Sequence, residues 1–182
     1  MSLRYVREMS FQLLYQFEFQ PEHIDEQSEQ FLGLAKQHEL AMQELYHLNW
    51  NETEQAESTQ LAQAVYAEKE ALDAVYAPHL IGWKISRLPK IDKIILRLAT
   101  YELLYRKEVP VSVILNEAVE LIKAYGEEKS RAYVNAVLGN VVKSNLEQIA
   151  NLREIAPESI TETISYKYAD NKDSADNKES VD

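Results

Sequence analysis

The chain has 182 residues, a formal net charge of −11 and no cysteine. This length is sufficient for one domain with a substantial core, so no second folded domain is required. Without cysteine the chain can form neither a disulfide nor a thiolate zinc site, and we expect a reducing compartment. The low content of glycine and proline, four and five residues, favours helix over sheet.

Two amphipathic helices are predicted near the N-terminus. The first runs from about Leu3 to Phe19, where apolar residues recur at helical spacing and Pro21 ends the pattern. The second runs from about Asp25 to Lys36. Charged residues interrupt the first apolar stretch, unlike a signal peptide, and no apolar run is long enough to cross a membrane. These features predict a soluble, cytoplasmic protein.

The middle of the chain contains a polar connection followed by a long helix. Residues 37–58 show only short apolar runs and a polar stretch. Apolar periodicity returns from about Thr59 to Tyr76, which predicts a long helix that Pro78 and Gly82 terminate. A short helical turn containing Trp83 is expected to follow.

Three consecutive helices are predicted in residues 91–140. The first is amphipathic and ends before Pro110. The second begins near Ser112 and ends at Gly126, where we expect a left-handed residue. The third begins near Ser130 and carries its own apolar stripe. This region therefore predicts a helical bundle.

The charge is distributed unevenly along the chain. Residues 1–80 hold 4 basic and 14 acidic residues, whereas residues 81–156 hold 12 basic and 9 acidic residues, a net charge of +3. The overall charge argues against a general nucleic-acid binder, although the second half is locally basic. Residues 157–182 are polar and lack sustained apolar periodicity. We expect them to be a disordered acidic tail after a domain at residues 1–156.

The sequence contains no pattern typical of a catalytic or metal site. The four histidines are scattered without metal-ligand spacing, and the isolated glycines form no phosphate-binding loop. Asn116 and Glu117 are the best catalytic candidates. No nucleophile or base accompanies them, and hydrogen bonds within the fold are the more common use of such residues. The sequence therefore predicts no enzyme, no cofactor and no metal.

The runs LRLATYELLYRKEVP, ILNEAVELIKAYG and SRAYVNAVLG closely resemble the core of the bacterial NusB family of transcription antitermination factors. The family pattern is roughly LRxAxYEL, INEAVELAK and FVNGVL, and the match is ungapped across residues 91–140. REMSFQLLYQFEF near the start resembles the family's first helix. The resemblance implies an all-α fold, a compact single domain of about seven helices in two packed bundles.

The same resemblance implies a binding protein and not an enzyme. NusB proteins pair with NusE, a small-subunit ribosomal protein, and recognise the boxA element of nascent RNA. RNA polymerase carrying the Nus complex then resists termination, notably in ribosomal RNA operons. The expected partners are therefore NusE, boxA-containing RNA and the RNA polymerase Nus complex, without a membrane. Some members of the family self-associate, which leaves a homodimer open.

The resemblance also indicates which residues bind. The family's arginine-rich first turn is reduced here to two arginines, so we expect weaker intrinsic RNA affinity. The expected partner-binding residues are Tyr15 and Asp92, which could instead be a core tyrosine and a charge favoured by the helix dipole. The expected RNA-binding residues are Arg4, Arg7, Lys123, Lys129, Arg131 and Tyr133.

Two other functions remain open from the sequence. The reduced arginine turn and the acidic charge favour a protein-interaction or structural module with little intrinsic RNA binding. NusB-like domains also occur at the start of some ribosomal RNA cytosine methyltransferases. Those enzymes need a following cofactor-binding domain, and this sequence offers neither the length nor the glycine-rich loop.

Overall fold

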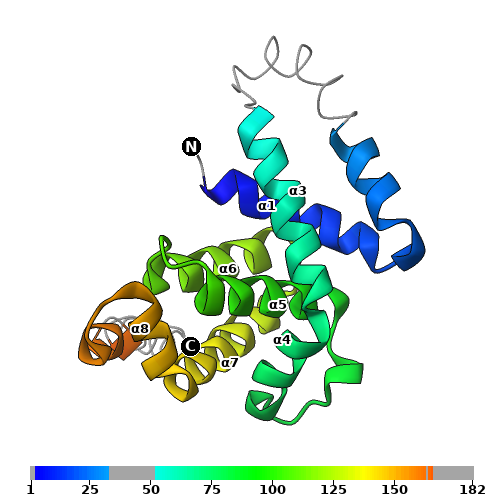
Figure 1. The fold of residues 1–182 in the computed structure, drawn as a ribbon. Helices are drawn as coiled ribbons and strands as arrows, with labels where there is room; N and C mark the ends of the chain where they lie inside the picture. The colour runs from blue at the N-terminus through cyan, green and yellow to red at the C-terminus, as the bar shows by residue number, and fades with distance from the viewer. Residues whose placement is uncertain (1–2, 33–51, 163, 166–182) are drawn as a thin grey trace, which may run out of the picture.

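The computed structural model describes residues 3–32, 52–162, 164 and 165 (Figure 1). These residues form helices and contain no strand, which confirms the predicted all-α class. The described part holds nine α-helices instead of about seven. They are α1 (Leu3–Phe17), residues 24–32, α3 (Glu52–Ala67), α4 (Lys69–Tyr76), α5 (Lys90–Tyr105), α6 (Val111–Tyr125), α7 (Glu128–Ser144), α8 (Leu146–Arg153) and residues 157–162.

Helix α5 lies at the centre of the fold (Figure 1). It contacts α1 and α3 on one side and α4, α6, α7 and α8 on the other. Helices α1 and α3 pack together, and residues 24–32 join them through a hydrogen bond from Gln63 to Ser28 of 3.2 Å. The remaining helices gather around α5. The two groups correspond to the predicted pair of helical bundles.

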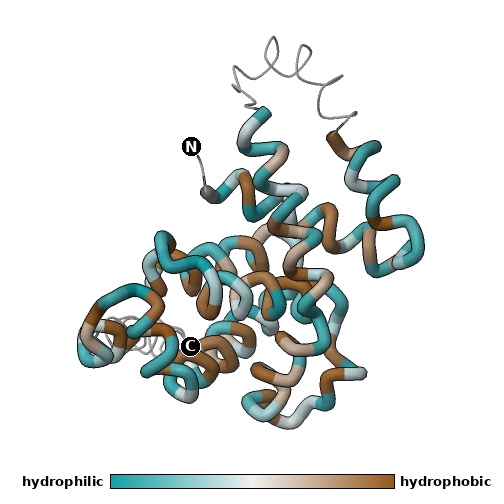
Figure 2. The backbone as a smooth tube through the Cα atoms, viewed as in Figure 1, coloured by the Kyte–Doolittle hydropathy of each residue, from teal (hydrophilic) through white to brown (hydrophobic). Residues whose placement is uncertain are grey.

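The apolar faces of both groups meet in one hydrophobic core. Figure 2 shows that apolar residues recur along the helices between hydrophilic ones. The largest fully buried side chains include Phe17 of α1, Tyr76 of α4 and Leu138 of α7. Fully burying one such leucine or phenylalanine contributes about 1.5–3 kcal/mol to the free energy of unfolding. Burial of these side chains therefore stabilises the packing of the helices that carry the predicted apolar stripes.

The predicted long helix from Thr59 to Tyr76 is two helices in the structure. Helix α3 begins earlier, at Glu52, and the backbone leaves helical geometry at Glu68 before α4 starts. No glycine or proline marks this break, and the apolar spacing continues across it, so the sequence did not reveal it. The first half of α3 is polar, and its contact with α1 includes a hydrogen bond from the Ser10 hydroxyl to the Ser58 carbonyl of 2.9 Å. Of the predicted connection at residues 37–58, residues 37–51 lie outside the described residues and residues 52–58 belong to α3.

The turn from α6 to α7 departs from the predicted cap geometry. Gly126 has φ −99° and ψ −172°, which is extended and not left-handed. Glycine suits this position for a steric reason, because an added Cβ would lie 3.0 Å from the carbonyl oxygen of Ile122. Helices α6 and α7 also begin before Ser112 and Ser130, which lie within the first turns and are not the caps.

The folded domain extends past residue 156, where the sequence placed its end. Residues 157–162 are helical, and Ile160 and Ile164 are buried in the core. Two isoleucines in an otherwise polar segment are too few to produce a recognisable apolar period. Residues 166–182 lie outside the described residues.

Candidate RNA and protein interface

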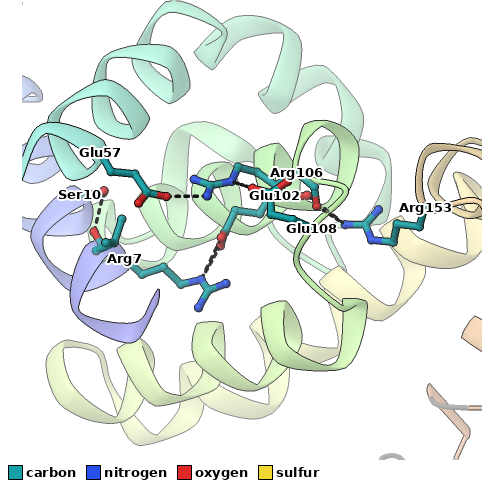
Figure 3. Close-up of polar contacts among 8 residues, drawn as sticks. Arg7, Ser10, Glu57, Glu102, Arg106, Glu108 and Arg153 are labelled. Atoms are coloured by element: carbon teal, nitrogen blue, oxygen red, sulfur yellow. Dashed lines mark hydrogen bonds and ion pairs between the residues drawn. The ribbon is translucent and has the colours of Figure 1, made fainter. Parts of the chain in front are cut away.

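Arg7, which the sequence placed at the RNA surface, is only 2% exposed. Its Nε donates to both carboxylate oxygens of Glu102, at 2.9 and 2.8 Å (Figure 3). Burial raises the pKa of Glu102, and the hydrogen bond and charge of Arg7 oppose that rise. A buried arginine needs such a partner to offset the loss of hydration. Arg7 therefore joins α1 to α5 inside the fold. This buried position does not fit the predicted contact of Arg7 with RNA.

Two further arginines hold the end of α5 (Figure 3). Arg106 donates to Glu57 of α3 at 2.6 Å and to Glu108 at 2.5 Å. Arg153 of α8 takes a place that sequence reasoning missed, because a single arginine in a polar segment usually lies in solvent. Its guanidinium donates to carbonyl oxygens at the end of α5 and in the following loop, those of Glu102, Leu103, Arg106 and Val109. These carbonyls are the groups that a helix end leaves unsatisfied.

Three of the predicted RNA-binding cations gather around one carboxylate. Arg4 of α1 has Nη2 3.9 Å from Oε2 of Glu120, and Lys123 of α6 has Nζ 2.5 Å from Oε1. The hydrogen bond and charge of Lys123 lower the pKa of Glu120, and the charges of Arg4 and Arg131 add to this effect. The side chains of Arg4, Lys123 and Arg131 are 65%, 44% and 40% exposed. Cations from α1, α6 and α7 therefore share one exposed face.

Tyr125 places these helix ends beside one another. Its hydroxyl donates to Glu8 of α1 at 2.5 Å and accepts from Gln12 at 3.0 Å. Its ring also packs against Phe11, with a centroid separation of 4.8 Å. These contacts hold the end of α6 against the middle of α1, and the Arg4–Glu120 contact lies about one turn closer to the start of α1. They link residues more than a hundred positions apart, which periodicity could not reveal.

A pocket of about 200 Å³ brings predicted RNA-binding and partner-binding residues together. Asp92 is almost fully buried in its wall, with Ser130 of α7 as a hydrogen-bonding neighbour, and its Oδ1 has no hydrogen-bond partner among the described residues. Burial raises the pKa of Asp92, and the bond to Ser130 opposes the rise. The carboxylate therefore lies inside the fold between the starts of α5 and α7 and is not an exposed contact. The pocket is lined by Trp83, Leu88, Pro89, Asp92, Lys129, Ser130 and Tyr133.

Lys129 and Tyr133 occupy different depths of this pocket. The Lys129 side chain is largely exposed, and its Nζ lies 2.8 Å from Glu127. Tyr133 is half-buried, and burial raises its pKa, so its hydroxyl stays neutral at physiological pH. Lys129 is accessible to a phosphate, whereas Tyr133 offers mainly its ring.

Tyr15 lies on the surface and not in the core. Its ring meets the exposed ring of Phe19 edge to face, with centroids 5.1 Å apart. The ammonium group of Lys90, at the start of α5, lies 4.2 Å from the centroid of the Phe19 ring. Sequence reasoning did not identify Phe19 or Lys90 as part of this surface. We call Tyr15, Phe19 and Lys90 the aromatic patch.

An ion-pair network fixes the helices beneath the aromatic patch. Arg97 of α5 donates to both carboxylate oxygens of Asp73 at 2.7 Å and to Glu18 at 2.6 Å. The structure has two tethers, because Arg97 binds Asp73 and Glu18 while Glu102 binds Arg7.

The described ranges contain no group of three or more histidine, aspartate and glutamate side chains that could hold a metal ion. Within the same ranges, no helix is both long enough and apolar enough to cross a membrane.

Comparison with known proteins places this arrangement in a family. The NusB family model matches residues 4–143. The transcription antitermination protein NusB of Acetivibrio thermocellus is 38% identical over 146 residues, which cover 80% of this chain and 92% of that protein. NusB of Ruminiclostridium cellulolyticum is 38% identical over 155 residues, covering 85% and 98%. NusB of Bacillus subtilis is 44% identical over 89 residues, covering 49% and 67%.

Solved structures have the same fold. NusB from T. maritima superposes with a TM-score of 0.65 at 27% identity, covering 89% of this chain and 98% of that chain. The solution structure of NusB from Aquifex aeolicus gives a TM-score of 0.62 at 24% identity, covering 81% and 92%. The chain therefore belongs to the NusB family of transcription antitermination proteins.

Proposed function

We propose that the protein binds boxA-containing RNA together with NusE, and that it acts in the cytoplasm within the RNA polymerase Nus complex to oppose termination. Membership of the NusB family supports a role in transcription antitermination. The observation that carries the RNA-binding part is the gathering of Arg4, Lys123 and Arg131 from three helices on one exposed face. We call these three residues the cationic face. The cationic face lies on a chain whose net charge is −11.

The cationic face suits the backbone of single-stranded RNA. Arginine and lysine bind phosphate through charge-assisted hydrogen bonds, and counterion release makes such binding depend on salt. Lys129 adds an exposed cation, and Tyr133 contributes an aromatic ring in the neighbouring pocket. Stacking of unpaired bases on aromatic rings, together with hydrogen bonds to base edges, gives RNA-binding proteins their sequence preference. Arg7 has no part in this surface, because it is buried against Glu102.

We assign contact with NusE to the aromatic patch of Tyr15, Phe19 and Lys90. Exposed aromatic side chains with a neighbouring cation are typical of the central residues of protein interfaces. Asp92 lies inside the fold two residues after Lys90, so its carboxylate is not part of this exposed surface. Tyr15 lies roughly 16 Å along α1 from Arg4, given the rise of an α-helix. One helix can therefore contact RNA near its start and NusE near its end.

The test is assembly of the three components. The purified chain, NusE and labelled boxA RNA are mixed and separated on a native gel, beside a scrambled RNA of the same length and composition. We expect a ternary complex with boxA RNA only. Equal complex formation on the scrambled RNA, or no complex on either, would contradict the proposal.

A protein-interaction module with little RNA binding is the second candidate. It is favoured by the carboxylates beside the cations of this region, since Lys123 pairs with Glu120, Arg131 with Glu128 and Lys129 with Glu127. On the same gel, this function predicts a complex of the chain with NusE whose affinity for boxA RNA does not exceed that of NusE alone.

A further inference from the structure

Glu120 differs from the other carboxylates near the cationic face. Oε1 lies 2.5 Å from Lys123 Nζ, and Oε2 lies 3.9 Å from Arg4 Nη2. Its two oxygens therefore face cations from two different helices, α6 and α1. Glu127 and Glu128 each pair with a cation two or three residues away in their own segment. The Glu120 side chain is also more enclosed than its partners, at 27% exposed.

A carboxylate in this position resembles the RNA phosphate that the same cations are expected to bind. Both groups present anionic oxygens to arginine and lysine and form the same charge-assisted hydrogen bonds. The pKa of Glu120 is lowered by Lys123, Arg4 and Arg131, so the carboxylate is ionised at physiological pH. An incoming phosphate must therefore share these cations with Glu120 or displace it.

We propose that Glu120 is an internal competitor for RNA phosphate and sets the RNA affinity of the cationic face. This inference rests on the RNA-binding function proposed above. While RNA is absent, Glu120 holds Arg4 and Lys123 close to one another. When a phosphate binds, the negative charge of Glu120 opposes it, so contacts with phosphate alone are weak. Binding then depends on additional contacts from bases and from NusE, which favours the correct RNA over other polyanions.

Glu120→Gln is the informative variant, because glutamine keeps the size and one acceptor oxygen and removes the charge. We expect its affinity for boxA RNA in the presence of NusE to rise about threefold to tenfold at low salt, since two exposed ion pairs are involved. The gain should shrink as salt increases, because added ions screen exposed charges. Fluorescence anisotropy of labelled RNA over a salt series measures both effects.

Glu147→Gln is the matched control. Glu147 is exposed at the start of α8. Helix α8 follows the end of α7, whereas Arg131 lies near the start of α7, so Glu147→Gln removes the same charge at a site away from the cationic face. Circular dichroism is expected to show the same thermal unfolding for both variants and the natural chain. An affinity of Glu120→Gln no greater than that of Glu147→Gln overturns the inference.

A second probe separates failure of this inference from failure of the proposed function. Inorganic tripolyphosphate is titrated into each protein without NusE or RNA, and the shifts of the backbone amide resonances of Lys123 and Arg131 are followed by NMR. We expect tighter binding to Glu120→Gln than to the natural chain or Glu147→Gln. Equal binding to all three contradicts competition by Glu120. Absence of boxA preference in the natural chain contradicts the proposed function, and the tripolyphosphate result then decides the role of Glu120.

Discussion

The Nε atom of Arg7 lies 2.9 and 2.8 Å from the two carboxylate oxygens of Glu102, a residue 95 positions later in the chain. Both side chains are about 3% exposed, so this ion pair lies inside the fold. It joins the first helix to the central helix, one turn from Arg4 on the cationic face. The two N-terminal arginines therefore have different roles, since Arg7 holds α1 in place and Arg4 remains accessible.

Breaking the Arg7–Glu102 pair is expected to destabilise the protein strongly. Arg7→Met leaves the Glu102 carboxylate buried without its partner, and we expect a loss of about 3–5 kcal/mol in the free energy of unfolding. The double variant Arg7→Met with Glu102→Leu removes both charges and is expected to lose much less. Urea unfolding followed by circular dichroism measures both. A loss below about 1 kcal/mol in Arg7→Met would show that the pair contributes little.

The buried carboxyl of Asp92 predicts a specific pH dependence. Its pKa is raised above the value of 3.8 by burial, so the folded state favours the neutral carboxyl. This contribution to stability is present below pH 3.8 and is lost as pH rises through the folded-state pKa. Asp92→Asn mimics the neutral form and is expected to gain stability relative to the natural chain between acidic and neutral pH. The free energy of unfolding of both proteins is measured across this pH range. A natural chain that gains stability relative to Asp92→Asn as the pH rises would contradict a raised pKa for Asp92.

Removing single cations from the cationic face should change the salt dependence of RNA binding. For Arg4→Ala or Lys123→Ala, we expect weaker binding and a slope of log K against log salt reduced by about 1, because each removes one phosphate contact. Lys107→Ala is the control, since Lys107 is exposed in the loop before α6, at the opposite end of that helix from Lys123. Unchanged slopes in both test variants would place the phosphate contacts elsewhere.

The aromatic patch should carry binding to NusE. Tyr15→Ala combined with Phe19→Ala is expected to weaken NusE binding by about tenfold or more, the size of effect seen when a central interface aromatic is truncated. Tyr105→Ala serves as control, because Tyr105 is also an exposed aromatic but lies at the other end of α5 from Lys90. Isothermal titration calorimetry with NusE compares the variants. Equal losses for the control and the double variant would argue against a specific patch.

The helices were predictable because their apolar periods and breaks are local. Pro89 and Pro110 marked the starts of α5 and α6, and Gly126 marked the end of α6, whereas the break at Glu68 and the end of α7 carry no such residue. The burial of Arg7 could also have been predicted from residue spacing in the sequence. Arg7, Ser10, Leu14 and Phe17 follow the spacing i, i+3, i+7 and i+10, and all four are buried. The position of Arg7 within the family's arginine-rich first turn instead predicted an exposed side chain.

The candidate site was predictable only as separate segments. Arg4, Glu120 and Arg131 meet because Tyr125 ties α6 to α1, and Asp92 meets Tyr133 because α5 and α7 start side by side. Such contacts depend on how helices pack and leave no period in the sequence. The same holds for Phe19 and Lys90, whose contact forms only when the end of α1 reaches the start of α5.

The central claim is tested most directly by equilibrium binding of labelled boxA RNA to the mixture of this chain and NusE, with the double variant Arg4→Ala and Lys123→Ala measured in parallel. We predict that the natural chain with NusE binds boxA RNA at least about tenfold more tightly than scrambled RNA, within the range that base contacts provide. The double variant should lose most of its affinity for boxA RNA while keeping its affinity for NusE. Equal affinity for both RNAs, or full boxA affinity in the double variant, would contradict the account.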